Sequence, residues 1–136
     1  MAQLNPYLTF ENNCREAMNF YKDCLGGELS LQTVSESPVM AAQMPVEMKD
    51  SILHSSLISG GVTIMASDLN NEERIEGTNV HLCINCESEN ELNSFFSKLS
   101  AGGKITAPVA DMPWGAKYGS LTDKYGKRWL FNFQKA

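Results

Sequence analysis

The most constraining feature of this sequence is a pattern that occurs twice, in residues 5–29 and again in residues 79–105. Each copy begins with an asparagine and alternating apolar residues, continues through a polar break into an amphipathic segment, and ends with two adjacent glycines. Asn5 and Asn79 lie 74 positions apart and the glycine pairs lie 76 apart, so one small insertion aligns the copies. Self-similarity over half of a chain predicts two copies of one supersecondary unit.

Length and charge limit the classes of protein to which the chain can belong. Its 136 residues, 43% hydrophobic and 20% charged, are expected to form a single domain, 1–136, with internal modules at about 3–67 and 78–134. A net charge of −5 without a Lys/Arg cluster argues against a nucleic-acid partner. The first residues lack a basic, apolar leader and no apolar stretch could span a bilayer, so we expect a cytoplasmic protein with no membrane partner.

The first copy predicts a strand, a helix and three further strands. Alternating residues predict a strand at 4–10, and apolar residues at helical spacing predict a helix that Asn12 or Asn13 caps and that ends near residue 25. The further strands are expected at 28–35, 51–59 and 62–67.

Residues 36–50 interrupt this pattern with two prolines and three methionines. Two interpretations are open: a long connection that lies on the core or on a second subunit, or a mobile flap over a pocket. Residues 68–77 are polar and are expected to link the two copies.

The second copy predicts the same order of elements. A strand at 78–85 precedes Ser88 and Glu91, whose spacing is that of a capping box. An apolar stripe at helical spacing follows, formed by Leu92, Phe95, Phe96 and Leu99. The remaining strands are expected at 104–109, 117–122 and 127–133. The fold class is therefore α+β, with two βαβββ modules.

A four-stranded sheet with one helix leaves one of its faces open. The residues expected to face the helices are apolar: Leu8, Phe10, Val80, Leu82, Ile84, Trp129, Phe131 and Phe133. The residues expected on the opposite face are mixed: Asn5, Tyr7, Thr9, His54, Thr63, Met65, Asn79, His81, Cys83, Arg128, Leu130 and Asn132. Unpaired polar groups cost about 1–3 kcal/mol each when buried, so a partly polar cleft between two such sheets explains this pattern.

Several motifs together resemble the vicinal oxygen chelate superfamily, which includes glyoxalase I, extradiol dioxygenases and bleomycin-resistance proteins. They are PYLTF at 6–10, AMNFYKDCLGGEL at 17–29, ILHSSLISGG at 52–61, IMASD at 64–68 and WGAKYGSLTDKYGKRWLFNF at 114–133. The PhnB-like branch is the nearest match. The resemblance implies a pair of half-barrels built from βαβββ modules, a small-molecule ligand and a homodimer.

Metal enzymes of this superfamily take one ligand from the first and last strand of each module. The resemblance places these positions at Asn5, Met65, Asn79 and Leu130, none of which is His or Glu. Divalent metals of this class need imidazole and carboxylate ligands, so we expect no metal and no other cofactor. His54 and His81 leave open a partial, non-standard metal site.

The expected ligand pocket consists of Tyr7, Thr9, His54, Met65, Asn79, His81, Trp114 and Arg128. His54 and His81 are the candidate acids or bases, although histidines at such positions are more often structural. Trp114 could be a lid over a ligand or part of a dimer contact. Arg128 could bind an anion or pair with a carboxylate at the rim. The spacing of Cys83 and Cys86 permits a redox or zinc site, but Cys83 belongs to a strand, so this is not favoured.

Two classes of function are consistent with these features. The first is a non-catalytic protein that binds a small molecule in the cleft between its modules. The second is a lyase, isomerase or dioxygenase-type enzyme that acts on a small carbonyl or oxygenated substrate through His54 or His81. The missing metal ligands favour the first.

Overall fold

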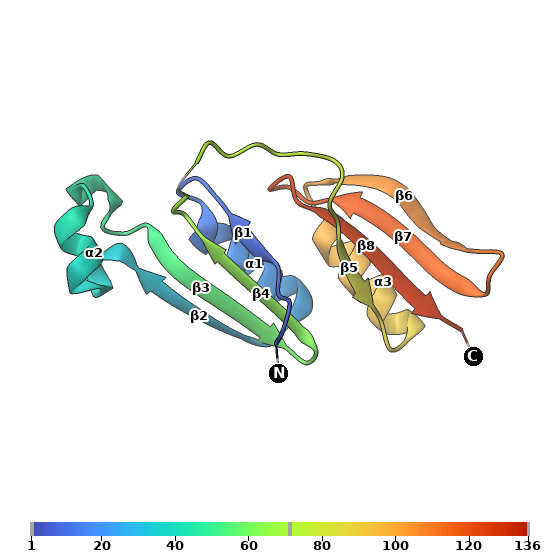
Figure 1. Cartoon of the computed structure of the whole chain (residues 1–136). Helices are drawn as coiled ribbons and strands as arrows, with labels where there is room; N and C mark the ends of the chain where they lie inside the picture. Colours follow the sequence, from blue (N-terminus) through green and yellow to red (C-terminus); the bar gives the residue numbers. More distant parts are fainter. Residues whose placement is uncertain (1, 71, 136) are drawn as a thin grey trace. The chain divides into compact units, whose positions relative to one another are not determined.

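The structure is a computed structural model that describes residues 2–70 and 72–135. The chain divides into two compact units, one ending at Arg74 and the other beginning at Ile75 (Figure 1). The boundary falls within the segment 68–77 that the sequence predicts as a linker. Among the described residues, no helix has the length and hydropathy that a membrane crossing requires.

The first unit consists of one four-stranded sheet and its helices. Its elements are β1 (Tyr7–Thr9), α1 (Cys14–Leu25), β2 (Glu28–Thr33), η1 (Val34–Glu36), α2 (Pro38–Gln43), η2 (Val46–Met48), β3 (Ile52–Ser59) and β4 (Val62–Ser67). The strand order is β1-β4-β3-β2, in which β1 and β4 run parallel and the other pairs antiparallel.

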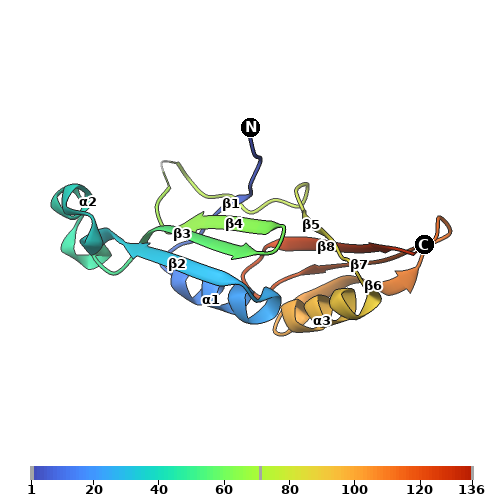
Figure 2. The same ribbon diagram turned by 90° about the horizontal axis from the view of Figure 1, so that it is seen from below.

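The second unit repeats this topology. Its elements are β5 (Leu82–Asn85), α3 (Glu89–Ser100), β6 (Lys104–Asp111), β7 (Ala116–Thr122) and β8 (Arg128–Gln134). The strand order is β5-β8-β7-β6, again with one parallel pair, β5 and β8. Figure 2 shows α1 and α3 each lying on one face of its own sheet. The predicted α+β fold of two βαβββ modules is therefore confirmed.

Each hydrophobic core lies between a sheet and its helix. In the first unit, α1 buries Ala17, Met18 and Tyr21, and the sheet buries Leu57 and Ile64. In the second unit, the buried side chains include Leu92, Phe96, Leu99, Leu121, Trp129 and Phe131. The apolar stripes read from the sequence are thus the buried faces of both helices.

Three predicted segments differ from the structure. The first strand begins at Tyr7, after Pro6, which has no N–H to donate but whose carbonyl still accepts a hydrogen bond from Met65 N at 3.0 Å. The strand predicted at 78–85 begins only at Leu82, so Val80 is 72% exposed and does not face the helix. The strand predicted at 28–35 ends at Thr33, and Val34 and Ser35 belong to the short helix η1. The connection at 36–50 contains the short helices α2 and η2.

The two helices begin with different caps. The Ser88 hydroxyl accepts a hydrogen bond from Glu91 N at 3.0 Å, which is one half of the predicted capping box. In place of the other half, Glu91 Oε1 accepts from Glu87 N at 3.0 Å. Asn13 occupies the corresponding position of α1, but its side chain makes no cap. Instead, Asp68 at the end of β4 accepts hydrogen bonds from Cys14 N at 2.9 Å and from Ile52 N at 2.8 Å. The predicted Asn12 or Asn13 cap is therefore wrong, and a residue more than fifty positions away caps the helix.

Asn12 has a different role. Its φ of 63° is the left-handed conformation that asparagine tolerates better than most residues. Its Oδ1 accepts a hydrogen bond from Ser51 Oγ at 2.9 Å. Asn12 thus forms the turn between β1 and α1.

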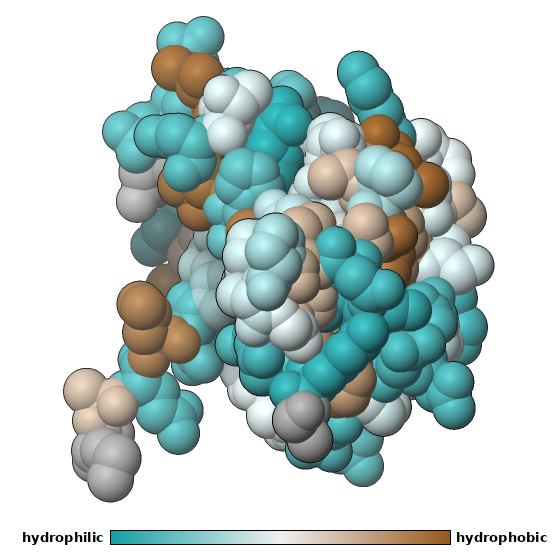
Figure 3. Space-filling view, turned by 90° about the vertical axis from the view of Figure 1, so that its right-hand side faces the viewer, coloured by the Kyte–Doolittle hydropathy of each residue, from teal (hydrophilic) through white to brown (hydrophobic). Residues whose placement is uncertain are grey.

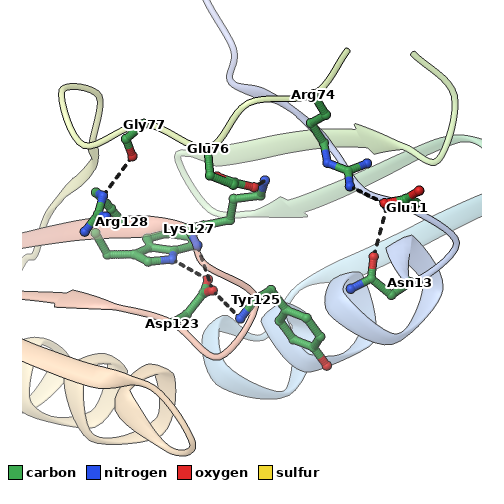
Figure 4. Close-up of polar contacts among 10 residues, drawn as sticks. Glu11, Asn13, Arg74, Glu76, Gly77, Asp123, Tyr125, Lys127 and Arg128 are labelled. Carbon is green, nitrogen blue, oxygen red and sulfur yellow. Dashed lines mark hydrogen bonds and ion pairs between the residues drawn. The ribbon is translucent and has the colours of Figure 1, made fainter. Parts of the chain in front are cut away.

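Ion pairs attach each end of the connection between the units to its own unit (Figure 4). On the first-unit side, Arg74 Nη2 lies 2.8 Å from Glu11 Oε2. On the second-unit side, Lys127 Nζ lies 2.6 Å from Glu76 Oε1. Ile75, between the two pairs, is 80% exposed.

Candidate functional site

In each sheet, one face packs against a helix and the other does not; we call the second the helix-free face. In the first unit, Ser55 faces α1, because its Oγ lies 3.6 Å from Cys14 Sγ. Successive residues of a strand point to opposite faces, so His54 and Ser56 belong to the helix-free face. In the second unit, Gly119 faces α3, because a Cβ there would lie 2.8 Å from a ring carbon of Phe96.

The helix-free face of the first unit is built from rows of paired residues. One row consists of Ser30, Ser56, Met65 and Tyr7, each paired with the next across the sheet. A neighbouring row contains the pair Gln32 and His54. Thr9 lies two residues beyond Tyr7 on β1 and therefore on the same face. The structure thus brings together four of the predicted pocket residues: Tyr7, Thr9, His54 and Met65.

Two aromatic rings are exposed on this face. The Tyr7 and His54 ring centroids are 6.0 Å apart, with an angle of 34° between the planes. Tyr7 is 49% exposed and His54 is also exposed. They come from β1 and β3, which are not adjacent, because β4 with Met65 lies between them. The rings therefore lie diagonally across three strands.

The second unit presents a different set of side chains at equivalent positions. In the first unit, Met65 pairs with Tyr7 and with Ser56. In the second unit, Leu130 occupies the equivalent position and pairs with Cys83 and with Ser120. By the same correspondence His54 is equivalent to Tyr118, which pairs with Asn132. Ser120 is buried, and its hydroxyl lies 2.6 Å from that of Thr106. At these equivalent positions the second unit has one ring, that of Tyr118, where the first unit has two.

Strand pairing also revises the alignment of the two copies. Because Tyr7 corresponds to Cys83, Asn5 corresponds to His81, whereas the sequence alignment paired Asn5 with Asn79. The four inherited ligand positions are then Asn5, Met65, His81 and Leu130, which offer one amide, one thioether, one imidazole and one hydrocarbon. This donor set does not fit the four-ligand metal site of the superfamily. Among the described residues, no cluster of three His, Cys, Asp or Glu side chains could hold a metal ion.

The remaining predicted pocket residues lie in the second unit and outside the middle of its sheet. Asn79 and His81 precede β5 and are exposed. Trp114 is 64% exposed in the turn between β6 and β7, where its carbonyl accepts a hydrogen bond from Gln134 Nε2 at 3.4 Å. These residues thus lie in two different connections, the segment before β5 and the β6–β7 turn.

Arg128 has a structural role. Its Nε donates to the Gly77 carbonyl at 3.0 Å, and its Nη1 donates to Thr122 Oγ1 at 2.9 Å. The guanidinium thus fastens the end of the connecting segment to the sheet, as Figure 4 shows for Gly77. Neither the anion nor the carboxylate expected from the sequence is its partner in these two hydrogen bonds.

Sequence reasoning missed several residues of the helix-free faces, among them Gln32, Ser56 and Tyr118. Alternation along β2, β3 and β7 could have identified them, because each lies two residues from another residue of the same face. The available signal was the polar character of Gln32 and Ser56 on strands in which leucines occupy the alternate positions.

The four cysteines are free, and only Cys83 is exposed. Burial raises the pKa of the Cys14 thiol to about 11, against a smaller opposing effect of its hydrogen bond with Ser55. Burial, with the nearby Glu91 carboxylate, also raises the pKa of Cys86 to about 11. Among the described residues, no third His, Cys, Asp or Glu side chain joins Cys83 and Cys86 in a cluster that could hold a metal ion. The raised pKa of Cys86 also disfavours the thiolate that a redox pair uses.

Exposed apolar side chains are scattered over both units. In the first unit Leu4 (99%), Val46 (71%) and Val39 (66%) are the most exposed of them, and in the second unit Ile75 (80%), Val80 (72%) and Trp114 (64%). On the face presented in Figure 3, hydrophobic side chains form small groups among hydrophilic ones.

Comparison with known proteins assigns the chain to a family. A sequence model of the Glyoxalase/Bleomycin resistance protein/Dioxygenase superfamily matches residues 3–131. The chain therefore belongs to this superfamily, as its paired βαβββ units indicate.

Three relatives are similar over nearly the whole chain. Protein YjdN of Escherichia coli (strain K12) is 29% identical, over 97% of this chain and 95% of that protein. Protein PA1353 from Pseudomonas aeruginosa, for which there is a crystal structure, is 32% identical in sequence to this chain. The two structures match with a TM-score of 0.86, and the match covers both chains completely. A putative 3-demethylubiquinone-9 3-methyltransferase, the PhnB protein from Bacillus cereus, is 25% identical, with a TM-score of 0.71, over 97% of this chain and 99% of that one.

Proposed function

We propose that this chain is a small-molecule-binding protein of the PhnB-like branch, and that it binds its ligand on the helix-free faces of its sheets without the inherited metal. The observation that carries the proposal is the exposure of Tyr7 and His54 on the same face as Met65. Where a sheet packs on a helix, this protein places apolar side chains. Exposed rings beside polar residues are instead typical of a surface that contacts a ligand.

The donor chemistry supports the metal-free part of the proposal. Neither the Leu130 side chain nor the Met65 thioether can replace a carboxylate or imidazole ligand of a divalent metal. We therefore expect less than one equivalent of Zn, Ni, Mn or Fe per chain after gentle purification, measured by elemental analysis. One tightly held metal that is lost on replacing His54 or His81 would instead support the metalloenzyme alternative.

A Rossmann-type methyltransferase function is not supported by the fold. Such enzymes bind their cofactor at a parallel sheet with a glycine-rich turn after the first strand. Both sheets here are mixed, and the segment after β1 reads FENNC. The methyltransferase name of the Bacillus cereus relative therefore does not provide a function for this chain.

We also propose that the chain forms a homodimer through the segment 36–50. Helix α2 has six residues, and none of them is buried. Val39 in this helix and the nearby Val46 expose most of their apolar surface. Isolated helices this short are unstable in water, so contact with a partner surface would stabilise it. Sedimentation at micromolar concentration tests this proposal. We expect a dimer that dissociates when Val39→Glu and Val46→Glu are introduced. A strict monomer of the parent protein would contradict the proposal.

The binding function is tested by a small-molecule stability screen followed by NMR. Compounds that raise the melting temperature should shift backbone resonances of residues on the helix-free faces. The residues expected to respond first are Tyr7, Thr9, His54 and Met65. A screen in which every stabilising compound shifts only residues elsewhere would contradict the proposal.

A further inference from the structure

The chemical class of the ligand can be inferred from the helix-free face of the first unit. Its two exposed rings, Tyr7 and His54, lie at a centroid distance of 6.0 Å, within the range over which aromatic pairs interact. Met65 lies on the strand between them, and a thioether makes favourable contacts with aromatic rings. Together these three side chains form a patch of rings and sulfur, which we call the Tyr7–His54 platform.

The described side chains next to the platform carry no fixed charge. The neighbours on the same face are hydroxyls and amides: Thr9, Ser30, Gln32, Ser56 and Thr63. Among the described strand residues of this face, Glu28 is the one carboxylate, and it is paired with Ile58 at the far end of β2 and β3. No lysine or arginine stands at these strand positions, so an anionic ligand would find no counter-charge there.

The second unit provides an internal comparison. At the positions of Tyr7, Met65 and His54 it has Cys83, Leu130 and Tyr118. The pair of rings is therefore a feature of one unit and is not a requirement of the βαβββ topology. If the two rings served only to stabilise the sheet of the first unit, the sheet of the second unit would be expected to contain an equivalent pair of rings.

From these observations we propose that the Tyr7–His54 platform binds a planar, uncharged aromatic or heteroaromatic ring. The ring stacks or makes edge contacts with Tyr7 and His54 and lies against Met65. Hydroxyl or carbonyl substituents of the ligand meet the Ser56, Thr9 or Gln32 side chains. This inference rests on the proposed function, because it names the ligand class of the same site.

The experiment compares two neutral probes of similar size, naphthalen-2-ol and its saturated counterpart decahydronaphthalen-2-ol. Each is titrated into the full-length protein and followed by NMR. Naphthalen-2-ol is expected to shift the resonances of Tyr7, His54 and Met65, and the saturated alcohol to bind about three- to tenfold more weakly, as loss of one or two aromatic contacts predicts. A third probe, naphthalene-2-sulfonate, is expected to bind more weakly than the neutral aromatic alcohol.

Variants separate the ring contact from a general effect on the sheet. Tyr7→Leu and His54→Leu should each weaken naphthalen-2-ol binding about three- to tenfold, whereas Tyr7→Phe, which keeps the ring, should bind nearly as the parent does. Tyr125→Leu is the matched control, because Tyr125 lies in the β7–β8 turn of the second unit beside Lys124. The unperturbed NMR spectrum of each variant establishes that it is folded.

The outcomes distinguish the two proposals. Equal binding of the two neutral alcohols, or unchanged binding by Tyr7→Leu and His54→Leu, overturns the platform as an aromatic site. If other compounds from the stability screen then bind to a helix-free face, the proposed function stands without this inference. If no compound binds to either helix-free face, both are overturned.

Discussion

The two units share one topology but fill the space between sheet and helix differently. In the first unit, three sheet residues have side chains of small or medium size: Ser55, Ile64 and Ala66. Their equivalents by strand pairing in the second unit are Gly119, Trp129 and Phe131. The absence of a side chain at Gly119 leaves room for Phe96, whose ring packs edge-on against Phe131 at 5.8 Å between centroids. The same architecture thus tolerates redistribution of core volume as long as the total is filled.

The units also differ in how far along the chain their stabilising contacts reach. The cap of α3 comes from Ser88, directly before the helix, whereas the cap of α1 comes from Asp68, directly after β4. In the second unit, Asp123 forms a local polar anchor: its Oδ2 accepts a hydrogen bond from the buried Trp129 Nε1, six positions along the chain, at 2.8 Å. Local and distant groups can therefore satisfy equivalent needs in equivalent places.

The largest effect is expected where the second core depends on its aromatic rings. Phe96→Ala should reduce the free energy of unfolding by about 3–5 kcal/mol, as expected for a truncated core aromatic. Gly119→Ala should also destabilise, because its Cβ would lie 2.8 Å from Phe96 and 2.9 Å from Val109. Part of that cost should disappear in the double variant. Denaturant unfolding of the single and double variants measures the coupling, and strict additivity would contradict the assigned fit.

A smaller effect is expected from the two helix caps. Asp68→Ala removes the acceptor for two backbone N–H groups, so it should cost about 1–3 kcal/mol. Ser88→Ala removes one cap and should cost about 1 kcal/mol. Urea unfolding of both variants compares them directly. If Ser88→Ala were the more costly change, Asp68 would not be the main cap of α1.

The cysteines allow buried and exposed positions of the protein to be compared by the reactivity of their thiols. Because burial raises the pKa of Cys14 and Cys86 to about 11, both remain thiols at pH 8, and iodoacetamide should label the exposed Cys83 first. Peptide mass spectrometry identifies the labelled residue, and the unfolded protein is the control in which all four react. Rapid labelling of Cys14 in the folded protein would contradict its burial.

The same raised pKa values predict a loss of stability at alkaline pH. The folded state keeps a proton that the unfolded thiol releases near its ordinary pKa of 9.0. The contribution of these thiols to stability is therefore fully present below pH about 9 and is lost as the pH rises towards about 11. Cys14→Ala should flatten this decline in a series of unfolding measurements, and an unchanged slope would contradict the assignment.

The smallest effect is expected from the ion pairs beside Ile75. Glu11 and Glu76 are largely or half exposed, so Glu11→Gln and Glu76→Gln should each cost less than about 1 kcal/mol. Added salt should reduce the difference from the parent protein further. Thermal unfolding at low and high ionic strength checks this, and a larger, salt-insensitive loss would indicate contacts beyond the ion pairs.

Features that depend on local periodicity could be predicted from the sequence. The buried stripes of α1 and α3, the β3–β4 turn and the Ser88 cap follow from spacing alone. Their physical basis is the fixed geometry of helices and strands, which links near neighbours in sequence. The membership of Tyr7, His54 and Met65 in one face was available for the same reason.

Features that depend on tertiary contacts could not be predicted in this way. The Asp68 cap requires β4 to end beside the start of α1, which no local pattern records. The alignment of His81 with Asn5 follows from strand pairing, which differs by two positions from the sequence alignment of Asn5 with Asn79. Strand β5 likewise begins only at Leu82 because, in the described pairing, no residue before Leu82 has a partner on the parallel strand β8.

The left-handed Asn12 has a consequence for how the two halves could diverge after duplication of an ancestral module. From Tyr7 to Asn13 the first unit has one residue more than the second has from Cys83 to Ser88, and the turn at Asn12 accommodates it. The β3–β4 and β7–β8 turns also differ in length, while the paired strands keep their register. An added codon inside a strand exchanges its two faces unless a bulge absorbs it, as at Leu53 of β3, whereas an insertion in a connection leaves both surfaces intact. Protein engineers can therefore lengthen this chain between Phe10 and Cys14 without altering which residues the sheet presents.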